Sequence, residues 1–227
     1  MREKEEILDS YRGQIQGLIY KYVMKIRANN EKLYGSRVAE QTDCFLRMLV
    51  DDEKRHCGTL VMVGYDMEGG TNTKMILEAA KALEMLHAYV LLTDGDTDID
   101  AALSGLHAAE MILANLDCDA ELRLKVLSIV NRTLLLRTHA RGTDRVADKL
   151  AWQSLEIAVD PLHVGMVLAG AECDATDAIT PFATALGQYL ITNNETDRIE
   201  AEKTLKALKP EKQRWSDAAS LFSVLID

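Results

Sequence analysis

Five acidic side chains lie within or just after a strongly apolar segment in the middle of the sequence. The segment 79–105 reads AAKALEMLHAYVLLTDGDTDIDAALSG, and its acids are Glu84, Asp94, Asp96, Asp98 and Asp100. Its first half has no continuous polar face, and a helix without one must be surrounded by protein. Carboxylates near a core are costly unless they are paired, protonated or bound to a metal. We therefore expect any functional site at the end of this helix.

Two of these carboxylates have the spacing of a metal site. Asp94 and Asp98 are four residues apart, so a continuous helix aims both side chains in the same direction. His87 precedes Asp94 by seven residues and shares that face. Mg²⁺ favours one or two carboxylates together with phosphate oxygens. The alternative is an acidic helix end that faces water, and Gly95 favours it by weakening the helix between the two acids.

Composition narrows the classes of protein. The chain has 227 residues, 48% of them hydrophobic, with 36 acids against 26 bases and a net charge of −10. That excess of acids argues against a nucleic-acid-binding protein and against binding to anionic membranes. No apolar run reaches the roughly 18 residues of a membrane span, and the N-terminus does not resemble a signal peptide. We therefore expect a cytoplasmic protein.

The four cysteines are scattered along the chain. They are Cys44, Cys57, Cys118 and Cys173, and no two form a CxxC pair. This distribution is typical of reduced thiols in a cytosolic protein, with disulfides or a zinc site as the alternatives.

Apolar residues recur at three- and four-residue spacing along almost the whole chain, which predicts helices. A chain of this length with only three prolines favours long helices over a turn-rich β fold. Asp160-Pro161 and Thr180-Pro181 each place a proline where a helix could begin. Asn194 is the expected N-cap of the next helix. The sequence predicts a single all-α domain over 1–227, with about ten helices around the buried central helix at about 73–93.

Three segments resemble one enzyme family. The segment 85–94, MLHAYVLLTD, resembles the central helix of the trans-isoprenyl (polyprenyl) diphosphate synthases, which reads roughly ExxHxxxLxHDDxxD. The segment 54–61, KRHCGTLV, is similar to the family's GKxxRP motif. The segment 161–171, PLHVGMVLAGA, is similar to its PLxIGAxLAGA segment. The resemblance covers about residues 5–200.

The resemblance implies a fold and a chemistry. The expected fold is the helical isoprenoid synthase bundle, and the family reaction transfers an allylic prenyl group to isopentenyl diphosphate. Lys54 and His87 match residues that hold a diphosphate, and Asp94 and Asp98 match the first and last aspartates of the first metal-binding motif. The implied cofactor is Mg²⁺, which neutralises the departing diphosphate. Family members usually form dimers.

Several charged positions of the family are replaced in this chain. Cys57 stands at the expected arginine of the GKxxRP motif, and Gly95 stands at the second aspartate of the first motif. The two arginines expected after that motif fall at Leu103 and Ser104, and the second aspartate-rich motif falls at Asn194, Glu195 and Arg198. The chain is also shorter than the family pattern, which predicts that part of the middle and C-terminal helices is missing.

These replacements lead to one main hypothesis and two alternatives. The main hypothesis is a shortened isoprenyl diphosphate synthase-like protein whose prenyltransferase activity is weak or lost. Its ligands would be isopentenyl or allylic diphosphate, and it would form a homodimer or a heterodimer with an active homologue. The first alternative is a non-catalytic prenyl-binding or regulatory subunit. The second is a redesigned helical scaffold without activity.

Overall fold

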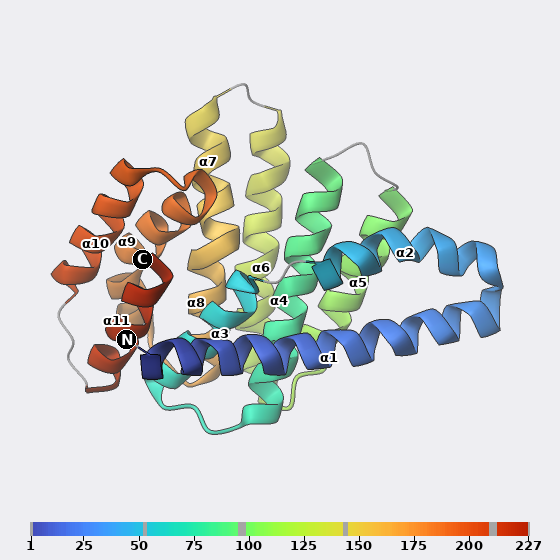
Figure 1. The fold of residues 1–227 in the computed structure, drawn as a ribbon, viewed down its shortest axis with the longest axis horizontal. Helices are drawn as coiled ribbons and strands as arrows, with labels where there is room; N and C mark the ends of the chain where they lie inside the picture. The colour runs from blue at the N-terminus through green and yellow to red at the C-terminus, as the bar shows by residue number, and fades with distance from the viewer. Residues whose placement is uncertain (1, 52–53, 95–98, 143–144, 209–212, 227) are drawn as a thin grey trace.

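The computed structural model describes residues 2–51, 54–94, 99–142, 145–208 and 213–226. Helices α7, η1 and α8 form one continuous run, so the described residues make ten helices, as the sequence predicts (Figure 1). The elements are α1 (Arg2–Tyr34), α2 (Ser36–Asp51), α3 (His56–Glu68), α4 (Thr73–Asp94), α5 (Ile99–Ala114), α6 (Ala120–Arg141), α7 (Val146–Ser154), the π-helical turn η1 (Leu155–Val159), α8 (Asp160–Leu168), α9 (Cys173–Thr192), α10 (Glu195–Ala207) and α11 (Gln213–Ile226).

Helix α4 is the buried central helix that the sequence predicts. It contacts α1, α2, α3, α5 and α8, and Figure 1 shows it in the middle of the bundle with α1 lying across it. Its buried side chains lie on all sides of the helix, from Met75 to Thr93. Even Lys81 is buried, with its ammonium 2.6 Å from Glu78 and 5.1 Å from the ring centre of Tyr22. Because α4 is held on all sides, the backbone positions of its candidate site residues Glu84, His87 and Asp94 are fixed.

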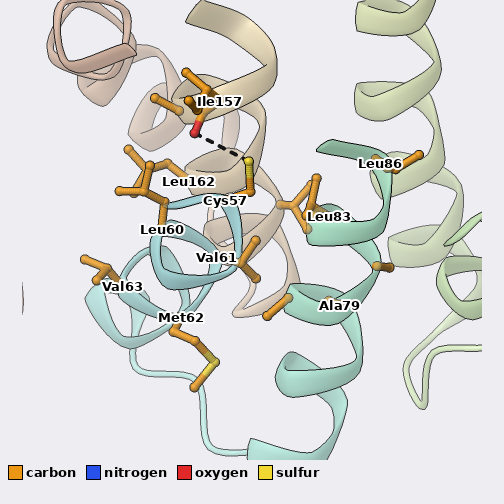
Figure 2. Close-up of a cluster of buried hydrophobic side chains, with 14 of the residues drawn as sticks. Cys57, Leu60, Val61, Met62, Val63, Ala79, Leu83, Leu86, Ile157 and Leu162 are labelled. Atoms are coloured by element: carbon orange, nitrogen blue, oxygen red, sulfur yellow. Dashed lines mark hydrogen bonds between the residues drawn. The ribbon is translucent and has the colours of Figure 1, made fainter. Parts of the chain in front are cut away.

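Helices α3 and α8 pack almost backbone to backbone through two glycines. A Cβ atom on Gly64 would clash with the carbonyl oxygen of Leu162, and one on Gly165 would clash with the carbonyl oxygen of Val61. Figure 2 shows the surrounding apolar cluster, in which side chains of α3, α4 and α8 meet. Close approach of two backbones requires residues without a Cβ, which explains both glycines.

Pro161 lies in the first turn of α8, as the sequence predicts, whereas Pro181 lies inside α9 and corrects the prediction that it begins a helix. Both lie inside continuous helical runs. Before Pro161 the chain forms the π-helical turn η1, in which the Asp160 N–H donates to the carbonyl of Leu155, five residues back. The wider turn accommodates the missing N–H of Pro161.

The second proline is accommodated in a different way. Pro181 leaves the carbonyl of Asp177 without its usual donor, and Asp177 is an exposed residue. Asn194 caps α10 as predicted, because its Oδ1 accepts from the Asp197 N–H at 2.9 Å. None of the described helices is long and apolar enough to cross a bilayer.

Candidate functional site

At the C-terminal end of α4, the carboxylate of Asp94 is paired with an arginine. Its Oδ1 lies 2.7 Å from the guanidinium of Arg137 on α6. The same guanidinium nitrogen donates to the Thr93 hydroxyl and, at 3.2 Å, to the Val90 carbonyl. Arg137 is 3% exposed, whereas the side chain of Asp94 is 37% exposed. The partly exposed carboxylate of Asp94 therefore neutralises the buried guanidinium of Arg137.

Aromatic rings hold the Arg137 guanidinium in place. The rings of Tyr89 and Trp152 have their centres 5.4 and 5.5 Å from its central carbon. Such contacts stabilise a desolvated cation. Sequence reasoning missed Arg137, because it lies 43 residues from Asp94 in the chain and no motif marks it.

The described residues contain only one of the two expected magnesium ligands at this helix end, Asp94. The carboxylate of Asp94 already has a guanidinium at 2.7 Å, and that cation repels a second one. Asp98, the other expected ligand, lies outside the described residues, as does Asp96. The Mg²⁺ site at Asp94 and Asp98 stays a prediction.

A small cavity lies between α4 and α6. Its volume is about 20 Å³. The lining residues come from α4, α6, η1 and α8, and they are Leu83, Leu86, Val90, Val130, Thr133, Leu134, Glu156 and Asp160. Small-molecule sites usually enclose about 300–1,000 Å³. The cavity has room for a water molecule and not for a prenyl chain.

Asp160, which lines this cavity from the first turn of α8, is buried with 2% exposure. Burial raises the pKa of its carboxyl to about 7, and the guanidinium of Arg132, 3.9 Å away, opposes the rise only in part. The group therefore titrates near neutral pH.

Lys54, just before the start of α3, lines an open hollow of about 530 Å³. Arg12 and His56 line the hollow with it, and Asn193, in the left-handed conformation, forms part of the wall. The three basic side chains make this hollow the most suitable described place for an anion. The diphosphate role of Lys54 stays a prediction.

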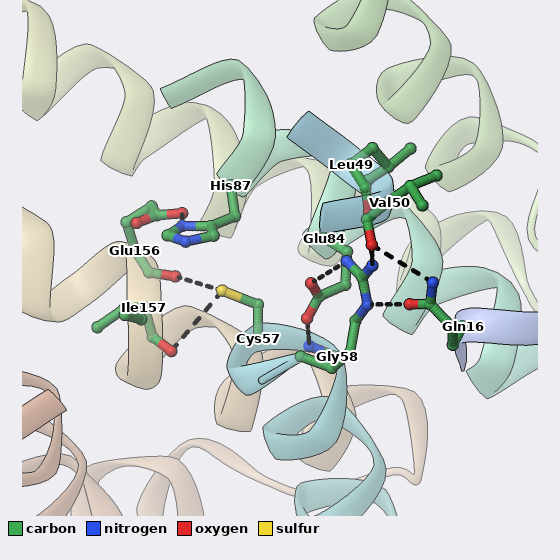
Figure 3. A network of polar contacts seen from close by, with 10 residues as sticks. Gln16, Leu49, Val50, Cys57, Gly58, Glu84, His87, Glu156 and Ile157 are labelled. Atoms are coloured by element: carbon green, nitrogen blue, oxygen red, sulfur yellow. Dashed lines mark hydrogen bonds and ion pairs between the residues drawn. The ribbon is translucent and has the colours of Figure 1, made fainter. Parts of the chain in front are cut away.

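The acidic side chain of Glu84 is paired inside the core. Its carboxylate lies 3.2 Å from the Arg55 guanidinium and accepts from the Gly58 N–H at 2.6 Å (Figure 3). Arg55 also donates to Gln16 at 2.7 Å and to the Leu49 carbonyl at 2.6 Å. It adopts a φ of 50°, in the left-handed region. This network ties α1, α2, α3 and α4 together. Sequence reasoning missed Arg55, because the family motif marks only its neighbour Lys54.

His87 faces a carboxylate and a thiol. Its Nδ1 lies 2.9 Å from Oε1 of Glu156 in η1. The Cys57 Sγ–H points at the carbonyls of Glu156 and Ile157, both at 3.8 Å. Figure 3 shows the three side chains of Cys57, His87 and Glu156 converging from α3, α4 and η1. The diphosphate role expected of His87 stays a prediction, and a carboxylate at this distance repels a bound anion.

No protein-family model and no curated protein sequence matches this chain. Solved structures do match it over nearly its whole length. A geranyltransferase from Legionella pneumophila has a TM-score of 0.69 at 13% identity, covering 99% of this chain and 96% of its own. A geranyl diphosphate synthase small subunit from Antirrhinum majus has a TM-score of 0.67 at 15% identity, covering 96% and 98%. The chain has the isoprenoid synthase fold.

A third similar structure is a deletion mutant of the heterotetrameric geranyl pyrophosphate synthase of mint. Its TM-score is 0.62 at 13% identity, and the match covers 93% of this chain and 98% of that one. At these identities the similarity is one of fold. The fold that the sequence motifs predict is therefore confirmed, while the chemistry depends on the residues described above.

Proposed function

We propose that this protein is a non-catalytic relative of the isoprenyl diphosphate synthases that acts as a partner subunit of an active homologue. The observation that carries the proposal is the small size of the cavity between α4 and α6, about 20 Å³. A prenyl chain growing from the end of α4 would need this space. A larger cavity would require the side chains of α4 and α6 that line it to move apart.

The replaced motif positions support the same proposal. Cys57 and Gly95 remove a cation and a carboxylate that the family reaction uses, and Arg137 occupies the carboxylate that remains. Each lost charge-assisted contact to a phosphate removes about 1.5–3 kcal/mol. An enzyme of modest rate enhancement lowers the activation barrier by roughly 8 kcal/mol, and several such losses together remove most of this.

A partner role draws on the structures to which this chain is similar. One of them is described as a small subunit and another as heterotetrameric. The chain also has a groove of about 750 Å³ between α1, α4 and α5, lined by Ile26, Met111, Ile112 and Leu116 among others. Met111 is 67% exposed there. An exposed apolar groove of this kind favours association with another protein, either a second copy or a homologue.

A second candidate function is weak prenyl transfer with retained diphosphate binding. The hollow around Lys54, Arg12 and His56 favours it, because three basic side chains can hold a diphosphate. In this case isopentenyl or allylic diphosphate would be the ligand and Mg²⁺ the cofactor.

An assay of prenyl transfer tests the proposal. The purified protein is incubated with Mg²⁺, isopentenyl diphosphate and an allylic diphosphate, alone and with an active geranyl diphosphate synthase. We expect no product from the protein alone, and a changed rate or product length in the mixture. Turnover by the protein alone that Asp94→Ala abolishes would overturn the proposal. A control variant, Lys149→Gln, changes an exposed lysine outside the hollow.

Pyrophosphate binding separates the two candidates further. A thermal shift with pyrophosphate that Lys54→Gln removes and Lys149→Gln retains shows that the hollow binds diphosphate. Binding without turnover agrees with the partner role, whereas binding with turnover supports the enzyme.

A further inference from the structure

We propose that Cys57, His87 and Glu156 form a zinc-binding site. Their candidate ligand atoms, a sulfur, an imidazole nitrogen and a carboxylate oxygen, all lie within 4.8 Å of one another. They come from three different elements, α3, α4 and η1 (Figure 3). The site stands independently of the proposed function, because it requires neither a diphosphate nor a partner.

The donor set selects the metal. Thiolate and imidazole are ligands that Zn²⁺ prefers, and Mg²⁺ prefers oxygen ligands only. Zn²⁺ with three protein ligands takes water as the fourth. Sequence reasoning kept zinc as an alternative for the cysteines, and the structure points to Cys57 because it alone joins a histidine and a carboxylate in such a cluster among the described residues.

The geometry requires only small shifts of the three side chains. Zinc bonds of about 2.0–2.3 Å at tetrahedral angles place neighbouring ligand atoms about 3.3–3.6 Å apart. The present separations are at most 4.8 Å, and the His87 Nδ1 to Glu156 Oε1 distance is 2.9 Å. Binding the ion would therefore widen the His87–Glu156 pair slightly and draw the most distant ligand atoms together by about 1 Å.

The charge balance suits a buried site. A thiolate and a carboxylate together neutralise the two positive charges of Zn²⁺, so no net charge remains in the low-dielectric interior. Binding replaces the Cys57 S–H bond by an S–Zn bond, and the proton leaves to solvent. The side chains of His87 and Glu156 keep 16% and 11% exposure, while Cys57 has 1%.

The π-helical turn supplies the third ligand. A π turn inserts a residue and redirects the side chains around it, and such turns are common at functional sites. Glu156 lies in this turn, and its side chain points at His87. In the same turn, the carbonyls of Glu156 and Ile157 face Cys57, which fixes the thiol beside the imidazole.

Metal titration of the full chain tests the proposal. The protein is stripped with a chelator, kept reduced, and titrated with Zn²⁺ against a chromogenic competitor, and separately with Co²⁺ as a spectroscopic probe. We expect one Zn²⁺ per chain and a sulfur-to-cobalt charge-transfer band in the near ultraviolet. Free Zn²⁺ at 100 times its Kd should raise Tm by about 5–10 °C.

Variants identify the ligands. Loss of an outer-shell partner of a metal ligand weakens binding about 10–100-fold, and loss of a ligand should weaken it at least as much. We therefore expect Cys57→Ser and His87→Gln each to weaken Zn²⁺ binding about 100-fold and Cys57→Ser to remove the cobalt band. Matched controls are Cys173→Ser, an exposed cysteine, and His107→Gln, which alters an exposed His–Glu pair with a separation of 3.3 Å.

Three results would overturn the site. They are no Zn²⁺ binding at 100-fold excess over protein, a Co²⁺ complex without the sulfur band, or binding that Cys57→Ser and His87→Gln both leave unchanged. If Cys57→Ser does not fold, the wild-type cobalt band together with His87→Gln and Glu156→Gln decides the question.

Discussion

Replacing Asp160 by asparagine should flatten the pH dependence of this protein's stability. Burial raises the pKa of Asp160 to about 7 in the folded protein, whereas an aspartate in an unfolded chain titrates near 3.9. Between these values the folded state holds a proton that the unfolded state has lost. Raising the pH through this window therefore stabilises the unfolded chain relative to the folded one.

The size of the effect follows from the two pKa values. The free energy of unfolding falls by about 1.4 kcal/mol for each pH unit in the window. From pH 5 to the folded pKa of about 7 the loss is about 3 kcal/mol. Above pH 7 the folded protein carries a buried carboxylate, and the loss stops. Asparagine has nearly the same shape and no charge, so the variant lacks this loss.

Urea unfolding of both proteins at pH 5, 6, 7 and 8 measures the difference. We expect the free energy of unfolding of the wild type to fall relative to that of Asp160→Asn by about 3 kcal/mol between pH 5 and pH 8. Asp174→Asn, at an exposed position of α9, is the control that should run parallel to the wild type. Parallel curves for Asp160→Asn and the wild type would refute the buried, proton-holding state of Asp160.

Three further predictions concern packing and charge. Arg55→Met should lower the free energy of unfolding in urea by about 3–5 kcal/mol, because it leaves Glu84 charged and buried. The double variant Arg55→Met/Glu84→Leu should recover part of this loss. Equal stability of Arg55→Met and the wild type would contradict the network. Gly165→Ala should cost about 1–3 kcal/mol by forcing α8 away from α3. Gly17→Ala should instead stabilise α1 by up to about 1 kcal/mol, because an added Cβ there has no neighbouring atom within 4 Å. A stabilising effect of Gly165→Ala would argue against the close contact of α8 with α3. Asp94→Asn should lower stability by about 1–2 kcal/mol through the loss of its pair with Arg137, whereas Asp148→Asn, from an exposed pair, should cost no more than about 1 kcal/mol. A variant Asp94→Asn as stable as the wild type would mean that Arg137 needs no counter-charge.

The helices could be predicted from the sequence because their signal is local. The apolar spacing gave the ten helices and the buried α4, and the Asn194 cap followed from residue type. Pro181 misled because a proline can stand either at the start of a helix or within it. Which of the two occurs depends on whether a wider turn or exposure to water compensates the missing N–H.

The candidate site could be predicted only in part, because partners distant in the chain decide it. The sequence indicates that Glu84 needs a partner, but Arg55 reaches it through a left-handed backbone conformation that no sequence pattern announces. The sequence placed Asp94 at the end of the central helix, but Arg137 comes from α6. His87 was expected to face a phosphate, and the structure places the carboxylate of Glu156 beside it.

The π-helical turn at Leu155–Val159 also divides one helix into two independent surfaces. One extra residue in a helix rotates everything beyond it by about 100°. Residues of α7 therefore follow one helical phase and residues of α8 another, although the backbone is continuous. A deletion of a single residue in the turn would bring the two phases into line and turn either Glu156 from His87 or Gly165 from α3. The contact of Glu156 with α4 and the contact of Gly165 with α3 thus both depend on one inserted residue. Either contact is kept only if the length of this turn is kept.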